Sequence, residues 1–286
     1  MTPAARVSAA IEILDAVLDG ARAETTLTRW GRANRYAGSK DRAAIGDHVF
    51  DALRQRDSAL GCAGGARTGR SLMRGILHSQ GVDLDTIFSD ARFAPVPLSS
   101  DERCFEQPIS DWENCDIPEW LWPHWCHSLG DQATAIAQLL QQRAPVFLRV
   151  NLLKATVDQA CVSLSDAGYD VSPHPDVPTA LCVTGRTAGL QTTEAYVDGL
   201  IELQDAHSQA SVTLLDPKQN GPILDYCAGG GGKSLALAAW LGGAVHAHDV
   251  NPGRMVDLHA RAKRANAQIS TRTKDQFEPD YDVVFC

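Results

Sequence analysis

The sequence predicts a multidomain protein of α and α/β architecture, with an all-helical N-terminal part, a small α/β subdomain and a truncated Rossmann-like, doubly wound parallel sheet. Three observations predict it. Apolar residues recur at helical spacing through residues 1–100, short strands alternate with helices from residue 144, and a run of glycines follows an apolar strand. A composition of 44% hydrophobic and 21% charged residues over 286 positions allows two or three cores and excludes a disordered chain.

The N-terminal part, residues 1–100, is expected to form a helical domain. Helical periodicity begins with a run over residues 4–19 and recurs over 45–53 and 72–76. No positively charged segment followed by a long apolar stretch opens the chain, so we expect no secretory signal.

A locally basic segment lies within this helical part. Its candidate RNA-binding residues are Arg29, Arg32, Arg35 and Lys40. Trp30 and Tyr36 are interleaved with them, and basic residues with interleaved stacking groups are what RNA binding favours. The segment is equally consistent with a solvated helix face whose Trp30 packs in the core.

A tryptophan-rich segment follows the Pro- and Ser-containing stretch at residues 93–102, and residues 101–143 are expected to form a helical connector. The possible metal ligands here are Cys115, His124, Cys126 and His127. Their spacing fits no standard zinc pattern, so we interpret the segment as packing and expect no metal. The chain's eight cysteines are scattered without a C-x-x-C pair, and most are expected to be buried thiols.

Residues 144–200 are expected to form the small α/β subdomain. A strand is predicted over 144–153, and a helix then begins with a capping box made by Thr156 and Gln159. Further strands are predicted over 169–174 and 180–185.

Residues 201–286 are expected to form the doubly wound sheet. Helices are predicted over 206–215, 234–241 and 252–265, and strands over 222–227, 244–249, 268–273 and 281–286. In such a sheet the ligand binds at the carboxyl ends of the strands, so the glycine loop after the first of these strands predicts the binding site.

The glycine loop can be compared with two nucleotide-binding templates. A Walker A loop ending in Lys233 and Ser234 needs glycine at position 227, which is Cys227. A dinucleotide fingerprint beginning at Gly229 needs glycine at position 234, which is serine. Asp249 closes the next strand and is placed to accept hydrogen bonds from ribose hydroxyls. We interpret the loop as favouring S-adenosylmethionine over NAD.

Four ordered motifs resemble those of one protein family. Residues 225–233 resemble the D-x-C-A-x-x-G-G-K signature of the Fmu/RsmB/Sun S-adenosylmethionine-dependent RNA cytosine-5 methyltransferases, which usually have Ala-Pro where this chain has two glycines. Residues 148–151 resemble the family's L-R-V-N, residues 203–209 its approach to the first strand, and residues 118–121 its P-x-W-L. The helical part is similar to the NusB-like RNA-binding domain of some bacterial members.

The resemblance implies a class I methyltransferase fold and a set of site residues. The cofactor loop would consist of Cys227, Ala228, Gly229, Gly230, Gly231, Gly232 and Lys233. Asp249 would bind the ribose, Asp275 would lie by the adenine, and Asp225 and Arg254 would support the site. Asp275 is also consistent with a turn residue and Arg254 with a surface helix residue. The small subdomain would bind RNA through Arg149 and Asn151.

The resemblance also implies a reaction: methyl transfer to carbon 5 of cytosine in 16S-type ribosomal RNA. Family members use an aspartate and two cysteines from loops after the fourth and fifth strands. Because residues 281–286 align with the fourth strand, we expect the catalytic cysteines beyond Cys286 and expect the chain as given to be inactive. Cys227 and Cys286 are expected to be neither of them.

RNA, specifically ribosomal RNA, is the expected partner, and we expect a cytoplasmic monomer without membrane association. The net charge of −9 and pI near 5.4 exclude a uniformly basic coat but not a local RNA site. Two other hypotheses remain open: a non-catalytic RNA-binding remnant of such an enzyme, and a nucleotide-hydrolysing enzyme with a degenerate Walker loop.

Overall fold

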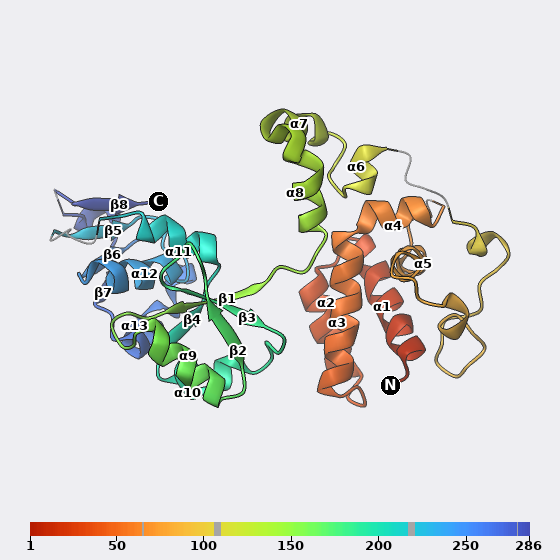
Figure 1. The fold of residues 1–286 in the computed structure, drawn as a ribbon, viewed down its shortest axis with the longest axis horizontal. Helices are drawn as coiled ribbons and strands as arrows, with labels where there is room; N and C mark the ends of the chain where they lie inside the picture. The colour runs from red at the N-terminus through yellow and green to blue at the C-terminus, as the bar shows by residue number, and fades with distance from the viewer. Residues whose placement is uncertain (65, 106–109, 217–220, 279) are drawn as a thin grey trace. The chain divides into compact units, whose positions relative to one another are not determined.

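The computed structural model describes residues 1–286 except 65, 106–109, 217–220 and 279, and it divides into two compact units. The first unit comprises residues 1–144 and the second comprises residues 145–286 (Figure 1). No helix in the described part of the chain has the length and apolar character that a membrane crossing requires.

The first unit contains helices and no strand among its described residues. Its five opening helices are α1 (Pro3–Leu18), α2 (Ala23–Ala33), α3 (Ser39–Arg54), α4 (Arg56–Cys62) and α5 (Gly69–Ser79). They bury one core, whose largest fully buried side chains are Ile13, Leu14, Ile45, Leu72, Met73, Ile76 and Phe88. The helices α4 and α5 pack so closely at Gly75 that a Cβ there would lie 2.1 Å from the Ala59 carbonyl oxygen. The helical periodicity predicted over 4–19, 45–53 and 72–76 therefore corresponds to α1, α3 and α5, whereas α2 and α4 were not predicted individually.

A series of short helical elements completes this unit. They are η1 (Leu84–Thr86), η2 (Asp101–Arg103), α6 (Asp111–Asn114), α7 (Trp122–Leu129), η3 (Gly130–Gln132) and α8 (Ala133–Leu140). Cys115 is buried and packs with Ile117 and Ala137 in a small separate core. No cluster of three or more potential metal ligands occurs among the described residues.

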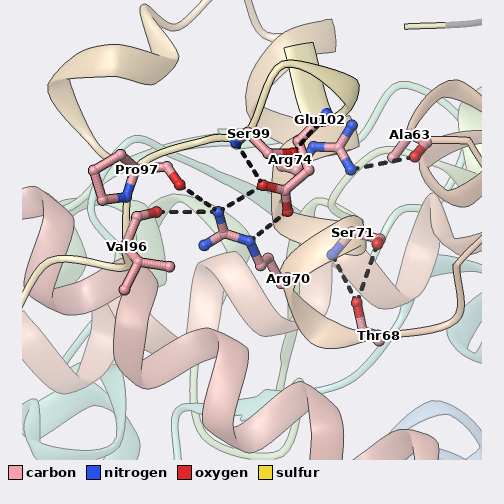
Figure 2. A network of polar contacts seen from close by, with 9 residues as sticks. All are labelled: Ala63, Thr68, Arg70, Ser71, Arg74, Val96, Pro97, Ser99 and Glu102. Atoms are coloured by element: carbon pink, nitrogen blue, oxygen red, sulfur yellow. Dashed lines mark hydrogen bonds and ion pairs between the residues drawn. The ribbon is translucent and has the colours of Figure 1, made fainter. Parts of the chain in front are cut away.

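An ion pair anchors the segment before α6 to α5 (Figure 2). Arg70 donates from Nε and Nη2 to the two carboxylate oxygens of Glu102 at 2.6 and 3.0 Å, and its Nη2 also donates to the carbonyls of Val96 and Pro97. The Ser99 amide donates to the same carboxylate at 2.9 Å. The hydrogen bonds from Arg70 lower the pKa of Glu102 to about 2.

The second unit begins with a four-stranded antiparallel sheet of order β2-β3-β1-β4. Its elements are β1 (Val146–Val150), α9 (Val157–Asp166), β2 (Asp170–Pro173), β3 (Ala180–Thr184), η4 (Leu190–Thr192), α10 (Glu194–Val197) and β4 (Ile201–Leu203). The predicted capping box is confirmed, because Thr156 and Gln159 exchange side chain to backbone hydrogen bonds at the start of α9. Since β4 pairs with β1, this sheet extends past the expected boundary at residue 200 to Leu203.

A parallel sheet of order β7-β6-β5-β8 forms the rest of the unit. Its strands and helices are α11 (Ala206–Thr213), β5 (Ile223–Asp225), α12 (Gly232–Leu241), β6 (Val245–Ala247), η5 (Pro252–Met255), α13 (Leu258–Ala265), β7 (Ile269–Thr271), η6 (Lys274–Gln276) and β8 (Val283–Phe285). β5 is the first strand of this sheet in the sequence. β6 and β7 follow on one side of β5, and β8 pairs with β5 on the other side. The reversal at β5 is the topological switch point of a doubly wound sheet, so the predicted fold class is confirmed.

One predicted helix is wrong in detail. The single helix expected over 252–265 is a 3-10 turn followed by α13. Asn251 accepts a hydrogen bond from the Gly253 amide at 3.1 Å through its side-chain oxygen, and this local turn replaces the first helical turn.

We predict that Glu102→Gln destabilises the first unit in a pH-dependent manner. The folded-state pKa of Glu102 lies below its usual value of 4.5, so the ion pair contributes fully above that pH and its contribution is lost as the pH falls towards 2. Because Glu102 is partly solvated, we expect a loss on the order of 1 kcal/mol at pH 7. Urea unfolding of the variant and the wild type should therefore differ at pH 7 and converge as the pH approaches 2. The exposed neighbour Asp101, changed to Asn, is the control and should show no such convergence.

Candidate functional site

The glycine loop leaves the carboxyl end of β5 and turns directly into α12. Gly229 and Gly231 have φ of +51° and +79°, backbone conformations that side chains disfavour. The Ala228 amide donates to the His248 carbonyl at 2.8 Å, and the Gly231 amide donates back to the Ala228 carbonyl at 2.8 Å. The loop is thus fixed against β6, and the first amides of α12 face the end of the sheet, where a helix N-terminus attracts electron-rich groups.

Asp249 follows β6 and lies against the same loop. Its carboxylate accepts from the Gly229 amide at 2.9 Å and from the Asn251 amide at 2.8 Å. The hydrogen bond from the Asn251 amide is the main cause that lowers the pKa of this carboxyl, and the bond from Gly229 adds to it. An ionised acceptor therefore stands beside the glycine loop at the carboxyl edge of the sheet, where a doubly wound fold binds its ligand.

Asp225, at the end of β5, has a structural role at the start of α12. It is buried, and its Oδ2 accepts from the Ser234 hydroxyl at 2.6 Å. Burial raises its pKa. Asp225 therefore connects β5 to the start of α12 and supports the glycine loop between them.

Behind the loop lies an ionic network. Arg149 of β1 donates to the Gly232 carbonyl at 2.9 Å, and Arg261 of α13 donates to the Gly230 carbonyl. Arg149 pairs across the sheet with Glu202 of β4, whose carboxylate also accepts from Arg261 at 3.2 Å. Burial lowers the pKa of Arg149 to about 10. Two guanidinium groups thus hold two loop carbonyls away from the ligand side.

Two predicted RNA contacts are wrong. Arg149 is 2% exposed and Asn151 is 1% exposed, so neither side chain is available to RNA. Asn151 instead donates from its amide to the carbonyls of Gly199 and Ala265 at 2.9 and 2.8 Å, joining the antiparallel sheet to the end of α13. Both residues are internal connectors of the second unit.

The remaining site candidates lie at the surface. Asp275 is exposed in η6 after β7, and a hydrogen bond from Thr273 lowers its pKa. Arg254 is exposed in η5. The structure brings Asp249 and the loop into contact and leaves these two residues without a direct contact to them.

The basic segment of the first unit is exposed as predicted. Its four basic candidates, Arg29, Arg32, Arg35 and Lys40, lie on α2, the following turn and the start of α3, and all are exposed. Trp30 is 7% exposed and donates from Nε1 to Glu12 at 3.2 Å. It belongs to the core and is no stacking group, whereas Tyr36 is 72% exposed.

Comparison with known proteins finds methyltransferases that are similar to part of this chain. Residues 117–188 match the methyltransferase RsmF/B-like, ferredoxin-like domain. Ribosomal RNA small subunit methyltransferase B of Shigella sonnei is 30% identical over 179 residues, which cover 61% of this chain and 42% of the relative. The same protein of Citrobacter koseri is 32% identical over 159 residues, which cover 55% of this chain and 37% of the relative.

Over these segments the chain is similar to the RsmF/B-like, ferredoxin-like domain and to ribosomal RNA small subunit methyltransferase B. It spans less than half of the length of these curated relatives.

Two crystal structures confirm the methyltransferase fold. The protein PH0851 superposes with a TM-score of 0.66 at 20% identity, covering 96% of this chain and 70% of that one. A methyltransferase homologue from Pyrococcus horikoshii superposes with a TM-score of 0.52 at 24% identity, covering 57% of this chain and 54% of that one. At these identities the likeness concerns the fold alone.

Sequence patterns do not reveal the network behind the glycine loop. Glu202, Arg261 and Arg264 carry no motif, and the helix of the two arginines resembles a solvated, basic surface helix. Only the pairing of β4 with β1 and the packing of α13 beside them bring these charges together.

We predict that Gly231→Ala strongly destabilises the second unit. A Cβ at Gly231 would lie 2.0 Å from Leu258 Cδ1, and the φ of +79° is unfavourable for alanine. We expect a loss of about 2 kcal/mol or more in the free energy of unfolding. The control is Gly230→Ala, whose Cβ would meet only Arg261 Nη1 at 3.4 Å and should cost far less. Equal destabilisation of the two variants in urea unfolding would contradict this account of the loop.

Proposed function

We propose that this chain is the cofactor-binding and RNA-binding part of an S-adenosylmethionine-dependent methyltransferase that modifies carbon 5 of cytosine in ribosomal RNA. The observation that carries the proposal is the contact between Asp249 and the Gly229 amide, which sets a carboxylate beside a glycine loop at the switch point of the sheet. The curated relatives are named as ribosomal RNA methyltransferases, which supports the substrate class.

The residues at this edge fit S-adenosylmethionine, which supplies an electrophilic methyl group when bound. The Asp249 carboxylate would accept hydrogen bonds from the two ribose hydroxyls. The loop from Cys227 to Lys233 would lie along the methionine end, where the amides at the start of α12 would bind its carboxylate. Asp275 would lie by the adenine, and Arg254 would support the site from η5.

The loop geometry suits a ligand without a pyrophosphate. The carbonyls of Gly230 and Gly232 are turned towards Arg261 and Arg149, and the amides of Ala228, Gly229 and Gly231 are already engaged within the protein. Few backbone donors are left to surround a chain of phosphates, and a carboxylate needs only the helix N-terminus.

The chemistry of the base sets a further requirement. Carbon 5 of cytosine is a weak nucleophile until a thiolate adds to carbon 6. We assign this thiolate to none of the cysteines in residues 1–286. Cys227 belongs to the cofactor loop, and Cys286 directly follows β8. The part of the reaction assigned to these residues is binding and orientation of the cofactor and the RNA.

Within this proposal each part of the chain has a role. Residues 1–100 are the NusB-like RNA-binding domain, 101–143 the helical connector, 144–203 the small α/β subdomain with its fourth strand, and 204–286 the cofactor-binding domain. Exposed Arg29, Arg32, Arg35 and Lys40 supply positive charge for phosphates, which dominate affinity for RNA.

Asp249→Ala is predicted to weaken binding of S-adenosylhomocysteine by at least about tenfold, because a hydrogen bond to a charged acceptor contributes about 1.5–3 kcal/mol. Titration calorimetry with the full chain measures the affinity for S-adenosylhomocysteine. Asp257→Ala removes an exposed carboxylate that directly precedes α13 and should bind normally. Thermal unfolding of both variants separates loss of the site from loss of the fold. Normal affinity of Asp249→Ala, or displacement of the ligand by ATP, would refute the assignment.

Charge reversal of Arg32 and Arg35 to Glu is predicted to weaken RNA binding and to reduce its dependence on salt. Each phosphate contact to a single strand contributes about 0.7 to the slope of log K against log salt, so the slope should fall by about 1.4. Fluorescence anisotropy with a labelled oligonucleotide at several salt concentrations measures this slope. Arg67→Glu with Lys263→Glu changes the net charge equally at other exposed positions and should leave the slope unchanged. If both double variants behave alike, the patch is only a solvated surface.

A further inference from the structure

A cavity of about 400 Å³ in the first unit is lined by residues of α1, of α2, of the turn between α2 and α3, and by Phe93. Its lining includes Glu12, Trp30, Asn34, Tyr36 and Phe93. Tyr36 and Phe93 are 72% and 67% exposed, whereas Trp30 is buried. The cavity therefore has a fixed aromatic floor and two aromatic side chains at its mouth, and its volume is within the range of small-ligand sites.

The loop that carries Phe93 is held in an unfavourable conformation. Phe93 has φ of +68°, which is rare for a bulky residue and is retained where the surroundings enforce it. The Ser89 amide donates to the Pro95 carbonyl at 3.0 Å, closing the loop on both sides of Phe93. The Arg92 guanidinium lies over the ring at 4.6 Å from its centroid. The loop thus exposes the Phe93 ring in a defined position. Because the ring is mostly exposed, its burial does not offset the conformational free energy of the positive φ.

Polar groups form another part of the lining. Glu12 accepts from Trp30 Nε1 at 3.2 Å, and Asn34 donates from Nδ2 to the Trp30 carbonyl at 3.0 Å. These bonds fix both side chains against the floor. A carboxylate and a carboxamide each retain further hydrogen-bonding capacity, including acceptors for the amino and imino groups of a nucleobase.

The surroundings of the cavity are basic. Arg35 lies between Asn34 and Tyr36 in the sequence, Arg92 precedes Phe93, and all of the basic candidates of α2 and α3 are exposed. Positive charge beside exposed aromatic rings is the combination that binds single-stranded nucleic acid, with bases stacked on rings and phosphates held by cations. An apolar protein partner would offer no opposite charge to these basic residues.

We propose that this cavity binds one unpaired nucleobase of single-stranded RNA, stacked against Tyr36 and Phe93, with its edge facing Glu12 and Asn34. Basic residues of α2, of the turn after it and of α3 hold the flanking phosphates. A base inside a duplex is not accessible to such a site, so the helical unit selects an unpaired segment. This inference rests on the proposed RNA-binding function and deepens it by naming the form of RNA and the residues that contact the base.

The experiment measures binding of the full chain to a labelled 12-nucleotide single strand, to the same strand with one abasic position at its centre, and to its duplex. Three variants are compared with the wild type: Tyr36→Leu, Phe93→Leu and the control Phe50→Leu, which removes a partly exposed ring of α3 that is not among the cavity lining. Leucine keeps an apolar side chain, and circular dichroism with thermal unfolding verifies folding.

We expect Tyr36→Leu and Phe93→Leu each to weaken single-strand binding about fivefold or more, because stacking of one base contributes that much or more. The salt slope should stay at the wild-type value, since no phosphate contact is lost. Phe50→Leu should bind normally, and the abasic strand and the duplex should bind the wild type as weakly as the single strand binds the cavity variants.

Two results overturn the cavity assignment. One is unchanged single-strand affinity in both cavity variants, and the other is equal affinity of the wild type for the single strand and the duplex. If either occurs while Arg32→Glu with Arg35→Glu still flattens the salt slope, the RNA-binding function stands and only the base site fails. If the wild type binds none of the three nucleic acids, the RNA-binding function fails together with the cavity assignment. Calorimetry with S-adenosylhomocysteine then decides the cofactor site separately.

Discussion

The buried carboxylate of Glu202 organises the second unit. It is 3% exposed and accepts from Arg261 and Arg264 of α13, while Arg149 faces it from the neighbouring strand. A buried charge is costly unless it is paired, and here one carboxylate is surrounded by three guanidinium groups. Because Glu202 and Arg149 belong to the antiparallel sheet and α13 belongs to the doubly wound sheet, this network fixes one sheet to the other.

The glycine loop of residues 227–233 depends on the same network. Arg149 and Arg261, which face Glu202, also bind the carbonyls of Gly232 and Gly230, so the orientation of the loop is set from outside the strand and helix that it connects. Asn151 adds a neutral connection between β1 and the end of α13. The antiparallel sheet thus supplies Arg149, a charged side chain that binds the glycine loop, and both belong to one compact unit.

The helical unit places its polar and aromatic groups differently. Trp30 lies in the core, and its indole and carbonyl fix Glu12 and Asn34 beside a cavity. The residues left at the surface are Tyr36, Phe93 and the arginines and lysine around them. One unit thus offers aromatic rings and positive charge, and the other offers an acidic, glycine-lined edge. The two units therefore present surfaces of different chemistry.

Local patterns in the sequence determined much of the secondary structure and the position of the glycine loop. A capping box, a glycine run after an apolar strand and an acid at the end of the next strand act over short stretches of chain, so their geometry follows from the order of the residues. Only the tertiary structure decided that Arg149, Asn151 and Trp30 are buried. Arginine and asparagine are ordinarily surface residues, and only the pairing of β1 with β4 and the packing of α13 supply the partners that let them be buried. The cavity beside Trp30 likewise exists only because α1, the turn after α2 and the loop at Phe93 converge, which no local pattern encodes.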